Sequence, residues 1–249
     1  MGKIKLGETD TRAPKDWDKQ ETKNRLVDVL AELDELQNLL YAESKHSLLI
    51  VIQGMDAAGK DGLIRNVFGK LNPQGVLVTS FKAPTAPELS HDFLWRIHMH
   101  APAKGYIGIF NRSQYEDVLI TRVHKWIDDD TAYKRMKAIN RWENLLEEHN
   151  STHVLKFYLH ISPEEQRRRL DDRIKNPAKQ WKYNEDDYKE ALLWDDYMRM
   201  YEDCFQHCNE VPWTIVPSDQ NWYKEYIVAT SVRDTLRGLN MKYPGLKKK

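Results

Sequence analysis

The chain has 249 residues, of which 41% are hydrophobic and 31% are charged. Its 38 basic and 38 acidic residues cancel, so the bulk charge indicates neither a nucleic-acid nor a membrane partner, and any anion site must be a local patch. No apolar run of about eighteen residues occurs and the N-terminus lacks the apolar segment of a secretory signal, which predicts a cytoplasmic protein without a membrane span.

The N-terminal part predicts an arm followed by a long helix. Residues 1–19 are polar and broken by Pro14, and we expect them to lie over the body or over a partner subunit. Residues 20–249 have the length of a single α/β domain. From Gln20 to Ser44, leucines and valines recur at helical spacing. This apolar stripe fits either packing on the sheet or a coiled-coil seam between subunits.

A phosphate loop is predicted directly after the first strand. The apolar run that begins at Leu48 is followed by Gly54, Gly59 and Lys60, in the spacing G-x-x-x-x-G-K. Glycines let backbone N–H groups converge on phosphate oxygens, the lysine adds a mobile positive charge, and the next helix offers its N-terminus to the same anion. The loop residues that we expect to contact phosphate are Gly54, Ala57, Ala58, Gly59, Lys60 and Asp61.

Two acidic residues make this loop unusual. Asp61 stands where the motif has the Ser or Thr whose hydroxyl holds Mg²⁺, and Asp56 adds a carboxylate inside the loop. Two carboxylates would repel a bound polyanion unless a divalent cation lay between them, so Mg²⁺, or Mn²⁺ in its place, belongs to the hypothesis. The alternative is a glycine-rich turn from strand to helix that binds nothing.

Strands and helices alternate along the rest of the chain. The predicted strands after the loop cover Gly75–Phe81, Gly105–Asn111, Thr152–Ile161 and Val211–Val216. The predicted helices cover Glu88–His100, Ser113–Arg122, Thr131–Asn150, a segment that starts at the Ser162 cap, Glu185–Cys208 and Trp222–Leu239. This alternation predicts a three-layer α/β/α fold, with a largely parallel sheet between helices.

Charged residues follow the third predicted strand. Asn111 stands where a phosphate-loop fold usually has an Mg²⁺-binding Asp, and Arg112 directly after it would project toward the phosphates. Glu116 and Asp117, one turn later, could supply the missing carboxylate, and Arg122 lies farther along the same segment. A structural cluster of salt bridges at a helix start is the alternative.

A second basic group predicts a lid at about residues 165–186. Arg169 and Arg173 are four residues apart and share a helix face, which can present two guanidinium groups to neighbouring phosphates. Lys175 belongs to the acid-free basic run that follows, and Lys82, after the second strand, is a further candidate. The alternative is a helix of solvated arginines that nearby acids neutralise.

Cysteine and histidine residues indicate no metal site. Cys204 and Cys208 have no second pair to complete a zinc site, so we interpret them as ordinary thiols. His91, His98 and His100 lack the carboxylate spacing of a metal site, and we expect them to be packing or surface residues.

Four segments resemble the polyphosphate kinase 2 family. They are Gly54-Met-Asp-Ala-Ala-Gly-Lys-Asp-Gly, Ala83-Pro-Thr, Phe110-Asn-Arg-Ser-Gln-Tyr-Glu-Asp-Val, and Gln180-Trp-Lys followed by Pro212-Trp-Thr. The resemblance runs from about residue 20 to residue 240 and implies a thymidylate-kinase-like P-loop kinase fold. It also implies phosphoryl transfer between inorganic polyphosphate and nucleotides. The third segment resembles the subgroup called class III, whose members accept both AMP and ADP.

The resemblance also implies roles for individual residues. It makes Asp56 a catalytic carboxylate associated with Mg²⁺, Lys60 a phosphate ligand and Arg112 a phosphate clamp. Asn111 and Asp117 depart from the usual Asp and Arg of the family. We therefore expect Glu116 to replace the lost carboxylate, with Asp56 and Glu116 as the metal ligands.

We predict from these observations a cytoplasmic, Mg²⁺-dependent polyphosphate:AMP/ADP phosphotransferase that forms ADP and ATP. We expect a homo-oligomer, dimer or tetramer, with no nucleic-acid or membrane partner. One alternative is an ATP-dependent nucleotide or small-molecule kinase of the same fold. Another is a binding module that holds nucleotide or polyphosphate without turnover.

Overall fold

The computed structural model describes residues 4–246. Within this range five strands form one sheet: β1 (Ser47–Gln53), β2 (Val76–Ser80), β3 (Ile107–Asn111), β4 (Thr152–His160) and β5 (Trp213–Pro217). Their order across the sheet is β2-β3-β1-β4-β5, and every neighbouring pair is parallel. The prediction of a parallel α/β sheet is therefore confirmed.

Strand β1 lies at the centre of this sheet and is buried along its whole length. Its residues Leu48, Ile50 and Ile52 are fully buried, as expected for a strand that is covered on both faces. Because all the strands run in the same direction, their carboxyl ends meet at one edge, where ligands bind in folds of this kind. The predicted phosphate loop follows β1 at that edge.

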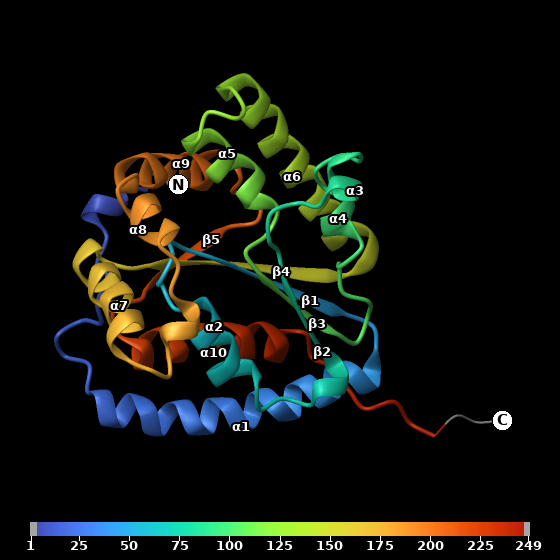
Figure 1. Cartoon of the computed structure of the whole chain (residues 1–249). Coiled ribbons are helices and arrows are strands. Elements are labelled where there is room, and N and C mark those ends of the chain that lie inside the picture. The colour runs from blue at the N-terminus through green and yellow to red at the C-terminus, as the bar shows by residue number, and fades with distance from the viewer. Residues whose placement is uncertain (1–3, 247–249) are drawn as a thin grey trace.

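Helices cover both faces of the sheet (Figure 1). They are α1 (Lys19–Glu43), α2 (Lys60–Leu63), α3 (Ala86–Leu89), α4 (Trp95–His98), α5 (Ile120–Val123), α6 (Asp129–Asn150), α7 (Pro163–Lys175), α8 (Asp186–Ala191), α9 (Trp194–His207) and α10 (Asn221–Gly238). Figure 1 shows α1, α2 and α10 below the sheet and α5, α6 and α9 above it. In the described part of the chain, no helix is both long and apolar enough to span a bilayer.

Helix α1 begins and ends where its local chemistry predicts. The side chain of Asp18 accepts a hydrogen bond from the Glu21 N–H at the N-terminus, and Ser44 ends the helix in a left-handed conformation. The apolar stripe, with Leu33 and Leu40 fully buried, lies along α10 (Figure 1). The stripe is thus covered within the chain, mainly by helix α10 rather than by the sheet as we expected, which disfavours a coiled-coil seam.

Several predicted helices are shorter than the sequence pattern suggested. The predicted helix Glu88–His100 is two short helices, α3 and α4, and Leu89, which we expected to face inward, is 68% exposed. The break lies at Ser90 and Asp92, whose side chains bond the local backbone and so compete with helix continuation. The predicted helix Ser113–Arg122 is a 3-10 helix, η4 (Gln114–Val118), followed by α5.

The N-terminal arm lies over the body of the same chain. Leu6 is buried, and its backbone N–H donates to Glu202 of α9. Farther along, Thr11 donates to Asp219, directly after β5. The arm therefore covers the sheet edge next to the phosphate loop.

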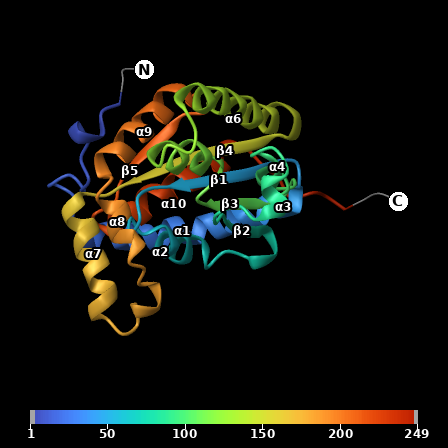
Figure 2. The same ribbon diagram turned by 45° about the horizontal axis from the view of Figure 1, so that its top comes forward.

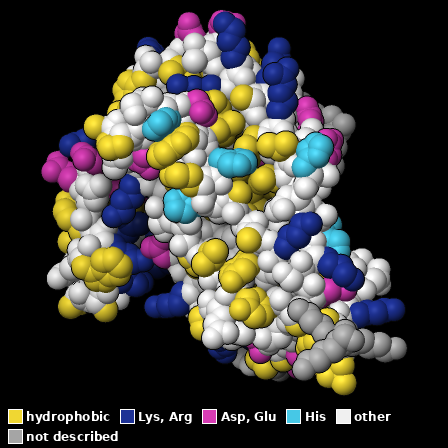
Figure 3. Space-filling model, turned by 90° about the vertical axis from the view of Figure 1, so that its right-hand side faces the viewer, with side chains coloured by type: hydrophobic (Ala, Val, Ile, Leu, Met, Phe, Trp, Pro, Cys, Tyr) yellow, Lys and Arg dark blue, Asp and Glu magenta, His cyan; other side chains and the backbone are white. Residues whose placement is uncertain are grey.

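The predicted lid is a helical hairpin that protrudes from the body (Figure 2). Helix α7 starts at Ser162, whose side chain accepts from the Glu165 N–H, as the cap pattern predicted. A 3-10 helix, η5 (Gln180–Lys182), leads back toward α8. Figure 3 shows a hollow between this lobe, at the left, and the body, with Lys and Arg side chains on its walls.

Candidate active site

The loop between β1 and α2 is held in a conformation that glycine makes accessible. Gly54 has φ 153°, and a β-carbon there would lie 2.9 Å from the backbone oxygen of Leu159. Gly59 has φ 97°, where a side chain would be strained. Ala57 adopts φ 62° without being glycine, a conformation that clusters at functional sites.

Several backbone N–H groups of this loop are free in the described part of the chain, whereas its carbonyl groups are bound by side chains. Within residues 4–246, the N–H groups of Ala57, Gly59 and Lys60 donate to no acceptor. The carbonyl groups of residues 54–58, in contrast, all accept hydrogen bonds from side chains. Free N–H groups around a concave turn form an anion-binding nest. This arrangement can bind a phosphate group.

Lys60 lies beneath this nest. Its ammonium donates to the carbonyl oxygens of Gly54 at 2.6 Å and Met55 at 3.2 Å, and the residue is 9% exposed. Burial lowers the pKa of Lys60, and the nearby positive charge of Arg112 acts in the same direction. A phosphate group in the nest would supply the negative charge that favours the ammonium form.

Arg112 joins the two carboxylates that the sequence analysis assigned to catalysis. Its guanidinium lies 2.6 Å from Asp56 and 3.5 Å from Glu116. Its backbone has φ 61°, a second strained residue at this site. The charge of Glu116 raises the pKa of Arg112, burial opposes this shift and Asp56 adds to it. Asp56, Arg112 and Glu116 therefore form one cluster beside the loop.

Asn111 and Asp61 form a second polar group at the same edge. The Asn111 amide donates to Asp61 at 3.0 Å, and Lys182 from the predicted lid donates to Asp61 at 2.8 Å. Burial acts to raise the pKa of Asp61, but these two hydrogen bonds and the charges of Lys182 and Lys60 together lower it. The Asn111 side-chain oxygen is buried and, in the described residues, has no hydrogen-bond donor.

This donor set suits a hard divalent cation. Mg²⁺ prefers oxygen ligands and is usually bound by one or two carboxylates together with substrate phosphates. Asp56 and Glu116 provide two carboxylates, and the Asn111 oxygen is an unused acceptor nearby in the sheet edge. No group of three His, Cys, Asp or Glu residues converges as a metal site within residues 4–246. The residues present thus fit Mg²⁺ bound together with phosphate.

Arg169 does not face the nest as we expected for a phosphate ligand. Its guanidinium donates to the loop carbonyls of Ala57 and Ala58 at 3.1 and 3.0 Å, and to those of Ser218 and Asp219 at 2.7 and 3.0 Å. Its Nε donates to Glu165 in the same helix. The structure therefore uses Arg169 to tie α7, the phosphate loop and the β5–α10 connection together.

Lys224 supports the loop beside Arg169, and both donate to the Ala58 carbonyl. This residue of α10 is 1% exposed, and its ammonium donates to Ala58 at 3.0 Å and Asn221 at 3.1 Å. Burial and the charge of Arg169 lower its pKa to about 7. The sequence analysis did not identify Lys224. Lys224 lies four residues before Val228, on the buried face of α10, and this spacing could have indicated a buried lysine.

The other lid residues form contacts within the lid and with the loop. Arg173 pairs with Asp187 of α8 and also donates to the Lys182 carbonyl. Burial raises the pKa of Asp187, the charge of Asp56 adds to the shift, and Arg173 opposes it. Asp187 is thus a carboxylate close to the Asp56 cluster that the sequence analysis did not find. Lys175 is exposed.

Two further predicted phosphate contacts form no hydrogen bond with the loop within residues 4–246. Arg122 has a side chain that is 4% exposed and paired with Asp129 and Asp203. Lys82 is exposed, and its backbone oxygen accepts from Arg96. Arg122 therefore behaves as the salt-bridge alternative described, whereas the exposed Lys82 stays a predicted phosphate contact.

A buried network anchors the segment that carries Arg112 and Glu116. Tyr115 donates to Glu143 at 2.8 Å, and Lys156 lies 2.7 Å from Glu143. The side chains of Lys156 and Glu143 are 0% exposed. A buried pair of this kind fixes geometry because separating its partners leaves an unpaired charge. The network therefore orients the η4 segment relative to the sheet.

Comparison with known proteins shows close relatives. Residues 16–244 match the family described as polyphosphate kinase 2. The AMP/ADP-polyphosphate phosphotransferase of Meiothermus ruber is 45% identical over 228 residues, which cover 91% of this chain and 85% of the relative. The ADP-polyphosphate phosphotransferase of Rhodopseudomonas palustris is 42% identical over an alignment of 257 positions, which covers 97% of this chain and 89% of the relative.

A solved structure has the same fold along the whole chain. The crystal structure of polyphosphate kinase 2 from Arthrobacter aurescens TC1 matches with a TM-score of 0.96 and 41% identity. The match covers 100% of this chain and 90% of that chain. The arrangement of sheet, loop and protruding hairpin is thus shared with that kinase.

Proposed function

The chain belongs to the polyphosphate kinase 2 family, and on that premise we propose that it transfers phosphoryl groups from inorganic polyphosphate to AMP and ADP, forming ADP and ATP. The observation that carries this proposal is the loop between β1 and α2, whose free N–H groups surround one anion site, with the Lys60 ammonium bound to the loop carbonyls beneath them. The cluster of Asp56, Arg112 and Glu116 lies directly beside it.

The residues of this site suit phosphoryl transfer between two polyanions. A nucleotide phosphate is already anionic near neutral pH, so the acceptor needs no strong general base. The protein must instead hold two negatively charged groups in line and neutralise their repulsion. We assign that role to the loop N–H groups, Lys60 and Arg112.

We further propose that Asp56 and Glu116 hold Mg²⁺, with the Asn111 oxygen available to it or to its water. Bound there, the cation would neutralise phosphate charge. Arg112 then has two roles, because it pairs with both carboxylates in the free protein and can contact phosphate when they bind the cation. Arg173 and Lys175 are proposed to contact the donor chain when the lid closes.

We also propose that the protein works in the cytoplasm, as a homo-oligomer. The edge strand β2 supports the second point, because Leu77 and Val78 are 50% and 51% exposed on it. An exposed apolar edge strand is a common site of association. Sedimentation at several protein concentrations tests this, and a single monomeric species throughout would refute it.

The test of the proposed function is an assay without ATP. The protein is incubated with polyphosphate and Mg²⁺ and with AMP or ADP, and the nucleotides are separated by ion-exchange chromatography. We expect ADP from AMP and ATP from ADP, and no product when Mg²⁺ is chelated. An ATP-dependent kinase would give no ATP here, and a binding module would bind polyphosphate without forming product.

A further inference from the structure

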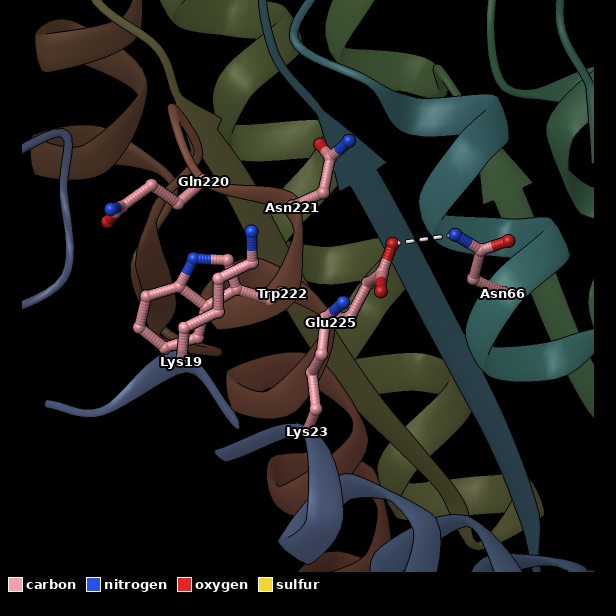
Figure 4. A pocket seen from close by; sticks show the side chains of 7 residues that line it. All are labelled: Lys19, Lys23, Asn66, Gln220, Asn221, Trp222 and Glu225. Carbon is pink, nitrogen blue, oxygen red and sulfur yellow. Dashed lines mark hydrogen bonds between the residues drawn. The ribbon is translucent and has the colours of Figure 1, made fainter. Parts of the chain in front are cut away.

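A cleft of about 500 Å³ lies beside the phosphate loop and has no role in the site described above. Figure 4 shows the side chains that line it, which come from the start of α1, from the segment η2 (Ile64–Phe68) and from the start of α10. They are Lys19, Lys23, Asn66, Gln220, Asn221, Trp222 and Glu225.

This cleft is linked to the phosphate loop through Asn221. The Asn221 oxygen accepts from Lys224, and the same ammonium donates to the loop carbonyl of Ala58. The Asn221 oxygen also lies 3.8 Å from the position that a β-carbon on Gly59 would occupy. The cleft is therefore next to the phosphate loop, and Asn221 and Lys224 lie between the two.

The amides in the cleft are oriented as donors. The oxygen of Gln220 accepts from the Ala13 N–H at 2.8 Å, and the oxygen of Asn221 accepts from Lys224. Within residues 4–246, neither amide nitrogen donates a hydrogen bond. Their acceptor ends are engaged and their donor ends are free, so these two residues favour a ligand rich in acceptors.

Trp222 supplies a further donor. It is 9% exposed, and its indole N–H has no acceptor in the described part of the chain. Figure 4 shows the ring nitrogen on the edge of the indole nearest Gln220 and Asn221. The nitrogen itself reaches the solvent, because it is not one of the fully buried polar atoms without a partner. A ligand oxygen in the cleft would satisfy it.

Two lysines give the cleft positive charge. Lys19 and Lys23 are one helical turn apart on α1, and neither forms an ion pair within residues 4–246. Lys19 is the first residue of α1, where the positive end of the helix dipole disfavours a cation. The helix itself therefore gains no stability from this charge, which leaves it available to attract an anion in the cleft. The start of α10 has no side-chain cap, and its first residues line the same cleft.

We infer that this cleft binds phosphate groups of the polyphosphate donor beyond those held in the phosphate loop. The inference rests on the proposed function and extends it to a second subsite. A polyphosphate chain carries charge along its whole length, and two linked anion sites bind such a chain more tightly than one. The cleft selects long donors because only these reach from the loop into it.

Glu225 repels an anion in the cleft, so its removal and the removal of the lysines should change the affinity in opposite directions. Its carboxylate lies in the same cleft and accepts from the Asn66 amide at 2.7 Å. Removal of this negative charge strengthens anion binding, whereas removal of the lysine charges weakens it. A site for a cationic ligand would respond in the opposite direction to both changes.

The test compares donors of different length. Initial rates of ATP formation are measured at saturating ADP, with a long-chain polyphosphate and with the shortest polyphosphate that the unmodified protein uses. We expect the double substitution Lys19→Gln, Lys23→Gln to raise the KM for the long donor about fivefold to tenfold, with kcat and the KM for the short donor unchanged. Glu225→Gln is expected to lower the KM for the long donor, and Trp222→Phe to raise it.

Two controls separate this subsite from general charge effects. The double substitution Lys104→Gln, Lys137→Gln removes the same charge from exposed positions elsewhere, and we expect no change with either donor. Thermal unfolding shows that each variant is folded. An unchanged KM for the long donor in the Lys19, Lys23 variant, or an equal rise for both donors, would overturn the inference. If the unmodified protein forms no ATP, the proposed function fails, and calorimetric titration with long polyphosphate still reports whether the two lysines bind it.

Discussion

Replacement of Arg169 by Lys tests how the phosphate loop is held. The guanidinium donates to two loop carbonyls and to two carbonyls after β5, all between 2.7 and 3.1 Å. A lysine ammonium is a single point of charge that cannot span both pairs, so one pair is lost. Two hydrogen bonds from a charged donor are worth at least about 3 kcal/mol together.

If that free energy holds the loop in its reactive geometry, kcat falls about 100-fold. The assay is the rate of ATP formation from ADP, with kcat and the KM for polyphosphate determined separately. Arg168→Lys is the matched control, because Arg168 is exposed and donates to Glu165 of the same helix. Loss of a phosphate ligand would raise the KM for polyphosphate, whereas loss of a loop support lowers kcat. A raised KM for polyphosphate with an unchanged kcat in Arg169→Lys would refute the loop-support role.

Three further changes probe other parts of the site. Asp56→Asn is expected to lower kcat by about 10² to 10³, because a charge at the reaction centre is lost, while calorimetry shows that polyphosphate still binds. The pKa of Lys224 is about 7 in the folded protein and 10.5 in the unfolded chain, so between these pH values the unfolded chain binds one more proton. Stability to urea therefore rises with pH from about 7 to 10.5. The substitution Lys224→Met should abolish this rise. Lys156→Met leaves Glu143 buried without its partner and should cost about 3–5 kcal/mol in the free energy of unfolding, measured by urea titration. A flat pH profile in the unmodified protein, or an unchanged unfolding midpoint in Lys156→Met, would contradict these two expectations.

Local patterns in the sequence were sufficient to predict the fold. The apolar run of β1, the glycine spacing that follows it and the Ser162 cap each depend on residues close together in the chain. The parallel sheet followed from the alternation of strands and helices. Helix lengths were less well predicted, because Ser90 and Asp92 end α3 through side-chain bonds that apolar periodicity does not register.

The roles of individual charged residues depended on tertiary contacts that spacing cannot show. Arg169 and Arg173 share a helix face, but one donates to loop carbonyls and the other pairs with Asp187. Lys224 supports the loop from a helix more than 160 residues later, at a distance in sequence that no local pattern spans. Arg122 follows the same motif as Arg112 yet is paired away from the loop. In each case the partner, rather than the residue type, decides the function.

Direct transfer of the terminal phosphoryl group is the central claim, and a labelled donor tests it most directly. The protein is incubated with ³²P-labelled polyphosphate, unlabelled ADP and Mg²⁺, and the products are separated by chromatography. The site described here predicts the label in the γ-phosphate of ATP, at a rate that falls when Asp56 is replaced by Asn. Label that appears only in inorganic phosphate, or ATP without label, would contradict it.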